Sequence, residues 1–227
     1  MKYKWLLFDA DNTLFDYDKA EAMALQATFE QFGHVFNPTY LDAYRRINER
    51  VFELYAQGSI TNKDVRYGRF EQLSKALGIE LDCIPFGDTH ISNLAGGAYL
   101  FDGAEEAVGA LSKKASMAII TNGLLDVSKP RVAKSTIGSY FKDIVSAEEI
   151  GVSKPNAGFF EITLGRIGNP SKEELLIIGD NLISDIKGGY DFGIDTCWFN
   201  PKRLTHNHDI EITYEINHLS QLLYILD

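Results

Sequence analysis

The segment that decides the fold is Trp5-Leu6-Leu7-Phe8-Asp9-Ala10-Asp11, in which a short apolar run ends at two acidic residues. A continuous apolar run of this length predicts a strand buried on both faces, as in a parallel sheet covered by helices. Similar runs recur in the second half of the chain. These further predicted strands are residues 117–120, 144–146, 175–178 and 196–199.

Stretches with apolar residues three or four positions apart separate these runs and predict the helices that cover the sheet. They are residues 104–113, 127–137, 157–167, 184–192 and 219–226. Asn156 and Ser184 fit as helix N-caps because their side chains can accept from free backbone amides. The alternation of strands and helices predicts an α/β fold with a Rossmann-like parallel sheet.

Residues 16–93 differ from the rest because they contain no β-branched run and show helical spacing throughout. The helical patterns lie at residues 20–32, 40–56 and 64–77, separated by Gly and Pro. We therefore expect an all-helical unit inserted after the first strand. The α/β core then consists of residues 1–15 and 94–227.

Composition excludes several classes of protein. The 227 residues suit one domain with an insertion, and the formal charge of −10 argues against nucleic-acid polymers and anionic membranes as partners. Two distant cysteines form no disulfide framework or zinc cluster, and no apolar run approaches the ~20 residues of a membrane span. These features predict a cytoplasmic protein. His206 and His208 are spaced to bind a metal but have no evident third ligand, so we expect a surface loop.

Polar residues fall where the predicted strands end. Asp9 and Asp11 follow the first strand, residues 121–123 (Thr-Asn-Gly) follow the second, and Asp180 follows the fourth. The carboxyl ends of parallel strands meet at one edge of a sheet, where ligands bind in such folds. We therefore expect these groups to gather there, with Lys154 near enough to join them.

The acidic residues predict a metal ion. Asp9 and Asp11 are two positions apart, which points their side chains the same way in extended chain, and Asp180 and Asp185 add two more carboxylates. Four carboxylates near one point repel each other unless a cation is present. Oxygen ligands without clustered His or Cys favour Mg²⁺ over zinc.

Hydrogen-bond donors accompany these acids. The Thr121 hydroxyl, the amides after it and the Lys154 ammonium can bind the oxygens of a phosphoryl group. A carboxylate can also act as a nucleophile and form an aspartyl-phosphate. The combination predicts a phosphoryl-transfer site.

Each residue also has an ordinary structural interpretation. Asp9 and Asp11 could form a turn, and so could residues 121–123. Lys154 could be a solvated lysine, and Asp185 could complement the positive end of the helix that begins near Ser184.

In residues 16–93 the arginines could meet substrate phosphate or line a solvated helix face, paired with Glu49, Glu53 or Asp64. These arginines are Arg45, Arg46, Arg50, Arg66 and Arg69. Phe15 and Tyr17 could stack on a nucleobase or simply pack.

Four stretches together resemble the motifs of the haloacid dehalogenase superfamily, in the order found there. They are Asp9-Ala10-Asp11-Asn12-Thr13, Thr121-Asn122-Gly123, Lys154-Pro155 and Gly179-Asp180-Asn181-Leu182-Ile183-Ser184-Asp185. The resemblance covers the whole core, and the helical insertion resembles the mobile cap of the subgroup with an all-α cap.

By this resemblance Asp9 is the nucleophile, and Asp11 protonates the leaving oxygen and then activates water. Mg²⁺ binds the Asp9 and Asp180 carboxylates and the Asp11 backbone carbonyl. Asp185 orients Lys154 or a metal-bound water.

The resemblance also assigns the residues that hold the substrate. Asp11, Thr121, Asn122 and Lys154 contact the phosphoryl group, and of these Asp11, Thr121 and Lys154 count with Asp9 as catalytic residues.

The acid at position 11 favours phosphate esters, because dehalogenases that attack carbon usually lack it. A narrower resemblance, to the pyrimidine 5′-nucleotidases of the superfamily, lies in residues 57–61, 67–70, 150–156 and 196–200. It implies a Mg²⁺-dependent phosphatase that prefers pyrimidine nucleoside monophosphates and works as a monomer or weak homodimer. Three alternatives remain: a sugar-phosphate or phosphoglycolate phosphatase, a phosphomutase, and a phosphate-ester binding protein without turnover.

Overall fold

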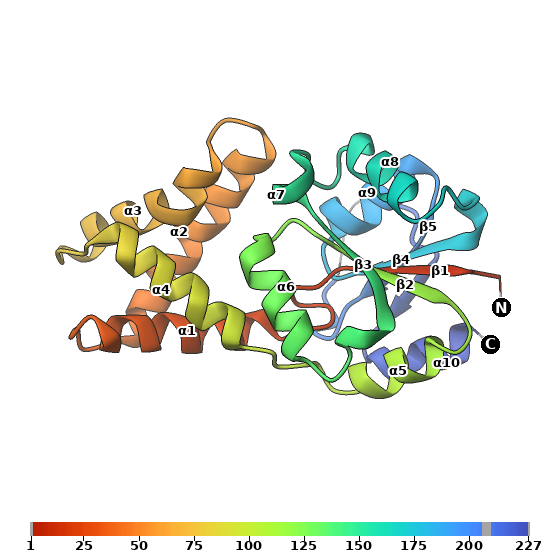
Figure 1. Cartoon of the computed structure of the whole chain (residues 1–227), viewed down its shortest axis with the longest axis horizontal. Coiled ribbons are helices and arrows are strands. Elements are labelled where there is room, and N and C mark those ends of the chain that lie inside the picture. Colours follow the sequence, from red (N-terminus) through yellow and green to blue (C-terminus); the bar gives the residue numbers. More distant parts are fainter. Residues whose placement is uncertain (1, 206–209, 227) are drawn as a thin grey trace. The chain divides into compact units, whose positions relative to one another are not determined.

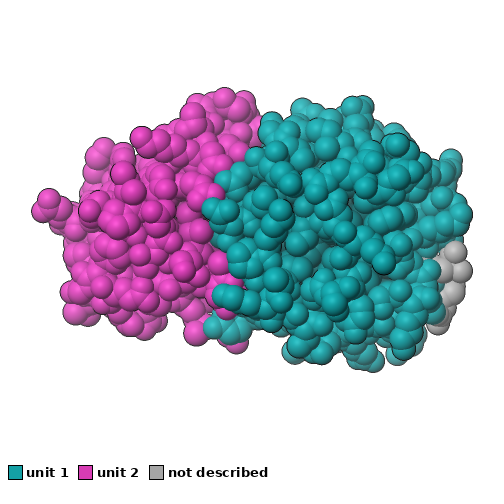
Figure 2. Space-filling model, in the orientation of Figure 1, with its two compact units in different colours: residues 1–17, 98–227 teal, residues 18–97 magenta. Residues whose placement is uncertain are grey.

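The computed structural model describes residues 2–205 and 210–226. His206 and His208, for which the sequence predicts a surface loop, lie outside the described residues. The chain divides into two compact units, Met1–Tyr17 with Ala98–Asp227 and Asp18–Gly97, which are coloured separately in Figure 2. The helical insertion thus begins and ends slightly later than the predicted 16–93, because its last helix continues to Gly96.

In the described part of the larger unit, six strands form one parallel sheet in the order β3-β2-β1-β4-β5-β6 (Figure 1). The strands are β1 (Trp5–Phe8), β2 (Ser116–Thr121), β3 (Phe141–Ser146), β4 (Leu175–Gly179), β5 (Asp195–Phe199) and β6 (Tyr214–Ile216). The predicted α/β fold and its five strands are confirmed. The strand β1 lies centrally, with Phe8 opposite Ile119 of β2 and Ile178 of β4.

Both faces of the sheet are buried, which explains the continuous apolar runs. Leu6 and Phe8 belong to the buried cluster on one face, and Leu7 belongs to the cluster on the other. The first face is covered by α5 (Ala104–Leu111), α6 (Leu125–Lys134) and α10 (Leu222–Ile225), and the second by α7 (Ala147–Ile150), α8 (Ala157–Arg166) and α9 (Gly188–Phe192) (Figure 1). None of the helices in the described residues is both long and apolar enough to cross a bilayer.

The smaller unit is all-helical. Its elements are α1 (Tyr17–Gln31), α2 (Pro38–Ala56), the π-helical segment η1 (Asp64–Gly68), α3 (Arg69–Leu77) and α4 (Cys83–Gly96). Aromatic rings form much of its core, with the Phe29 and Phe86 ring centroids 5.1 Å apart and those of Phe70 and Phe86 5.2 Å apart. Sequence analysis missed α4, because Pro85 and Gly87 interrupt its pattern.

The arginines of this unit differ in their surroundings. Arg50 is an exposed residue paired with Glu53 at 2.9 Å, as predicted for a solvated helix face. Arg69 contradicts that prediction, since it is buried and donates to the Asn48 side chain at 2.8 Å. Its guanidinium also lies 5.0 Å from the centre of the Phe70 ring, so aromatic packing and a buried amide replace the expected solvent.

One predicted helix start is confirmed and one is wrong. The Asn156 side chain accepts from the Gly158 amide at 2.9 Å and caps α8. Ser184 is not a cap, because the helical chain there begins earlier, as the π-helical segment η4 (Leu182–Lys187). Asn181 caps it by accepting from the amides of Ile183 and Ser184.

Candidate active site

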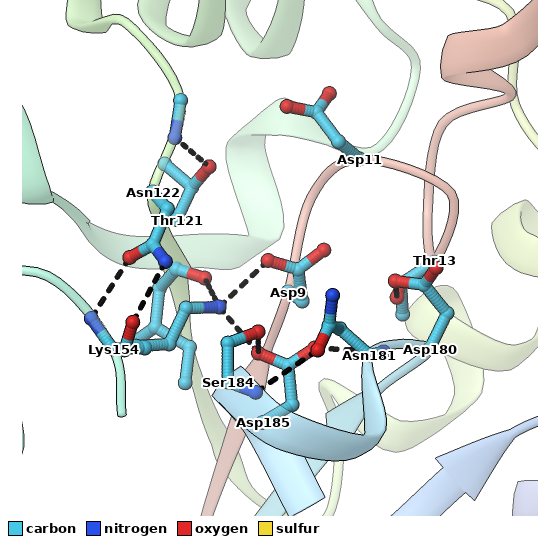
Figure 3. Close-up of polar contacts among 12 residues, drawn as sticks. Asp9, Asp11, Thr13, Thr121, Asn122, Lys154, Asp180, Asn181, Ser184 and Asp185 are labelled. Carbon is cyan, nitrogen blue, oxygen red and sulfur yellow. Dashed lines mark hydrogen bonds and ion pairs between the residues drawn. The ribbon is translucent and has the colours of Figure 1, made fainter. Parts of the chain in front are cut away.

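The polar residues that follow the strands do meet at the carboxyl edge of the sheet (Figure 3). Asp9 continues from the central strand, and its amide donates to the Ile178 carbonyl of β4 at 2.8 Å. Asp180 directly follows β4, and its side chain accepts from the Thr13 hydroxyl at 3.2 Å. The sheet register therefore brings together residues that are distant in the sequence.

Lys154 lies at the centre of this group. Its Nζ donates to Asp9 Oδ1 at 2.7 Å, to Asp185 Oδ1 at 2.6 Å and to the Ile120 carbonyl at 2.8 Å. These contacts use all three of its donors, and the side chain is 1% exposed. The interpretation of Lys154 as a solvated lysine is wrong. Burial lowers its pKa, but the two carboxylates outweigh this effect and raise it, so the ammonium stays charged.

Asn122 fixes the backbone of Lys154. The Asn122 side chain accepts from the Lys154 amide at 2.9 Å and donates to the Lys154 carbonyl at 3.0 Å. Next to it, the Thr121 hydroxyl accepts from the Gly123 amide at 2.9 Å. The loop after β2 thus positions the lysine as well as its own hydroxyl and amides.

Asp185 contacts Lys154 as the sequence suggests, and more. Its Oδ1 also accepts from the Ser184 hydroxyl at 3.3 Å, and its Oδ2 accepts from the Asn181 amide at 3.1 Å. The side chain is 1% exposed and contacts Lys154, so its role is more than complementing the positive end of a helix. A methyl group on Gly179 would lie 2.4 Å from Asp185 Oδ2, so only glycine leaves room for this carboxylate.

Asp11 does not join the other acids. Its carboxylate points away from Asp9, Asp180 and Asp185 (Figure 3) and forms an ion pair with Arg131 of α6. Sequence analysis missed Arg131, which is fully buried. A signal was present, because Arg131 lies four residues after Val127, on the stripe of α6 that packs inward.

A family model described as haloacid dehalogenase-like hydrolase matches residues 6–199. The chain belongs to this family. The match spans every strand end that carries a residue of the site, and the chain is therefore a hydrolase of the haloacid dehalogenase superfamily, as its motifs imply.

Named relatives resemble the chain over its whole length. The pyrimidine 5′-nucleotidase YjjG of Escherichia coli is 32% identical over 100% of this chain and 99% of its own. The pyrimidine 5′-nucleotidase PynA of Streptococcus pneumoniae is 33% identical over 100% of this chain and 96% of its own. The HAD-hydrolase YfnB from Bacillus subtilis has a crystal structure with bound magnesium. Its sequence is 36% identical to this chain, and the two structures align with a TM-score of 0.91 over 100% of both chains.

The haloacid dehalogenase-like site has a donor set that fits a magnesium ion. Oxygen atoms of Asp9, Asp180 and Asp185 all lie within 4.8 Å of one another. All three are hard carboxylate ligands, with no His or Cys in the group, which suits Mg²⁺. Burial and the neighbouring Asp185 raise the pKa of Asp180 to about 7, and burial raises that of Asp9 despite Lys154. Burial therefore opposes ionisation of Asp9 and Asp180, and a bound cation would favour it.

The raised pKa values of Asp9 and Asp180 predict how the free energy of unfolding depends on pH when metal is chelated. In EDTA the folded protein keeps protons on Asp180 and Asp9 at pH values where the unfolded chain has lost them, so stability falls as pH rises. We expect the free energy of unfolding to fall by a few kcal/mol between pH 4 and about 7. Urea unfolding at several pH values measures this.

Mg²⁺ and Asp180→Asn provide the controls for this experiment. Both should flatten the pH profile, since one neutralises the carboxylates and the other removes one of them. A wild-type profile in EDTA that rises over the same range, or that Asp180→Asn leaves unchanged, would contradict the raised pKa.

Proposed function

We propose that the chain is a magnesium-dependent phosphomonoesterase that works through an aspartyl-phosphate on Asp9. The contact between Asp9 and Lys154 at the end of the central strand carries this proposal. It puts a carboxylate nucleophile beside a permanent positive charge, with Asp11 two residues away as the proton donor. Both are what an in-line attack on phosphorus requires.

In the first step an Asp9 oxygen attacks phosphorus and the bond from phosphorus to the ester oxygen breaks. Asp11, as the carboxylic acid, gives its proton to the departing oxygen, so the alcohol leaves neutral. The Thr121 hydroxyl and the Asn122 backbone amide bind phosphoryl oxygens, and the Lys154 ammonium binds one by exchanging one of its three present acceptors for it. Their fixed positions stabilise the charge that gathers in the transition state.

In the second step Asp11, now a carboxylate, takes a proton from a water molecule. The water oxygen attacks phosphorus and the bond from phosphorus to Asp9 breaks. Inorganic phosphate leaves, Asp9 is a carboxylate again, and Asp11 is protonated for the next cycle.

In this scheme the Asp9 and Asp180 carboxylates and the Asp11 backbone carbonyl would hold the metal ion, and Asp185 would act through water. Mg²⁺ bound there would neutralise phosphoryl and carboxylate charge that otherwise repel each other. Lys154 supplies the remaining positive charge.

The substrate class we propose is the pyrimidine nucleoside 5′-monophosphates. The names of YjjG and PynA support it, as relatives aligned over the whole chain. We assign base and sugar recognition to the helical unit, as a cap domain, because two of the nucleotidase-like segments, residues 57–61 and 67–70, lie in it.

One experiment tests the reaction and the substrate together. Phosphate release is measured with Mg²⁺ and with EDTA on pyrimidine and purine 5′-monophosphates, sugar phosphates and phosphoglycolate. We expect EDTA to abolish release and pyrimidine monophosphates to give the highest kcat/KM. Better turnover of sugar phosphates would overturn the nucleotidase assignment, and release that persists in EDTA would overturn the metal requirement.

A further inference from the structure

The feature that the reaction scheme leaves unexplained is Arg131. Its side chain is 0% exposed, yet the described residues offer it one carboxylate, Asp11, and the face of the Phe15 ring at 4.9 Å. Within residues 2–205 and 210–226, its Nε and Nη1 atoms have no hydrogen-bond partner. A buried guanidinium with so few partners costs stability, and an apolar residue on this inward stripe would pack without that cost.

The surroundings of Asp11 indicate what the buried Arg131 does. Arg131 Nη2 donates to Asp11 Oδ1. The other oxygen, Oδ2, faces Gly123, where an added Cβ would lie 3.0 Å from it. One side of the Asp11 carboxylate is therefore held by a rigid donor, and the other abuts the loop that we assign to phosphoryl binding.

We propose that Arg131 is the positioning residue for Asp11, holding its carboxylate so that Oδ2 exchanges the proton with the ester oxygen and then with water. The proposal rests on the proposed function. A guanidinium carries only donors, so Oδ1 is occupied as an acceptor and the transferred proton belongs on Oδ2. The guanidinium is also planar and permanently charged, and it packs over the Phe15 ring, so its single Nη2 contact holds Oδ1 in one place.

The test separates positioning of the proton donor from general damage by varying the leaving group. An alkyl alcohol needs a proton as it departs, whereas 4-nitrophenolate leaves readily without one. We expect Arg131→Met to lower kcat/KM for the preferred nucleoside monophosphate by about 10²-fold, within the range of general acid catalysis, and for 4-nitrophenyl phosphate by less than about 10-fold. For the nucleoside monophosphate, the kcat/KM of Arg131→Lys should lie between the values of the wild type and of Arg131→Met.

A double-mutant cycle sharpens the assignment. Asp11→Asn should show the same dependence on leaving group, and Arg131→Met should add little in that background, because the group that it positions is gone. Arg166→Met is the matched control, at an exposed arginine paired with Asp143 and Glu149. It should leave kcat/KM unchanged for both esters. Equal losses on both esters, or losses that multiply in the double variant, would overturn the proposal.

Failure of the proposed function can be distinguished from failure of the inference about Arg131. If the wild type hydrolyses neither ester, the phosphatase assignment fails, and crystal structures of the wild type and Arg131→Met then test the positioning. An Asp11 carboxylate that leaves Gly123 in the variant supports the inference, and one that stays in place overturns it. The same comparison, made with Arg131→Lys, applies if Arg131→Met does not fold.

Discussion

Replacing Asp9 by asparagine is expected to lower phosphate release by roughly 10⁶-fold, the size of loss that follows removal of the nucleophile in subtilisin. An amide nitrogen or oxygen cannot form the acyl phosphate that divides the reaction into two steps. The other groups that bind the phosphoryl oxygens remain, but they stabilise a transition state that the variant cannot reach.

The fold of the Asp9→Asn variant should persist. The pKa of Asp9 is raised by burial, so a neutral side chain of the same shape suits the site, and the amide oxygen can still accept from Lys154. Thermal unfolding and steady-state kinetics together measure both expectations. Asp191→Asn makes the same chemical change at an exposed residue of α9 and should leave turnover unchanged. A soluble, folded Asp9→Asn variant with substantial activity would disprove the assignment of the nucleophile.

The second large effect is expected from Lys154→Met. Methionine fills the same space but leaves Asp9 and Asp185 buried without their ammonium partner. Removing one member of a buried ion pair costs about 3–5 kcal/mol, which corresponds to a fall in Tm on the order of 10 °C for a chain of this size. Turnover should fall by at least about 10³-fold, because a donor to the phosphoryl oxygens is lost with the charge.

Mg²⁺ gives this prediction a distinctive signature. A divalent cation compensates part of the lost charge, so Mg²⁺ should raise the Tm of Lys154→Met by more than it raises the Tm of the wild type. Lys142→Met, at an exposed lysine of β3, is the matched control and should change neither quantity. A variant as stable as the wild type in EDTA would show that the buried ammonium is not needed to hold the two carboxylates together.

The parallel sheet could be predicted because its strands are buried on both faces. In β1, Leu6 and Phe8 pack on one side and Leu7 on the other, so every position must be apolar and the run stands out. The strand β6 has no such pattern, since it is a three-residue edge strand whose Glu215 is exposed. The helix α4 was not predicted because Gly87 looks like a helix breaker in the sequence. The structure explains this glycine, since an added Cβ would lie 2.8 Å from the Arg66 carbonyl oxygen.

Asp9, Lys154, Asp180 and Asp185 lie in motifs at the carboxyl edge of the sheet, so the sequence pattern was enough to predict that they meet. The orientation of Asp11 does not follow from topology, because it depends on a long side chain from another element. Arg131 reaches Asp11 from a helix more than 100 residues later in the chain. Pattern analysis assigns an arginine to solvent by default, and only side-chain packing shows that Arg131 and Arg69 are buried.

Covalent trapping tests the central claim most directly. The wild-type enzyme is mixed with Mg²⁺ and its preferred phosphate ester, quenched within one turnover and reduced with borohydride, which converts an aspartyl-phosphate to homoserine. Peptide mass spectrometry then locates the change. The scheme predicts homoserine at position 9 only, and none in the Asp9→Asn variant or without substrate. Homoserine at another aspartate, or complete turnover with Asp9 never modified, would contradict it.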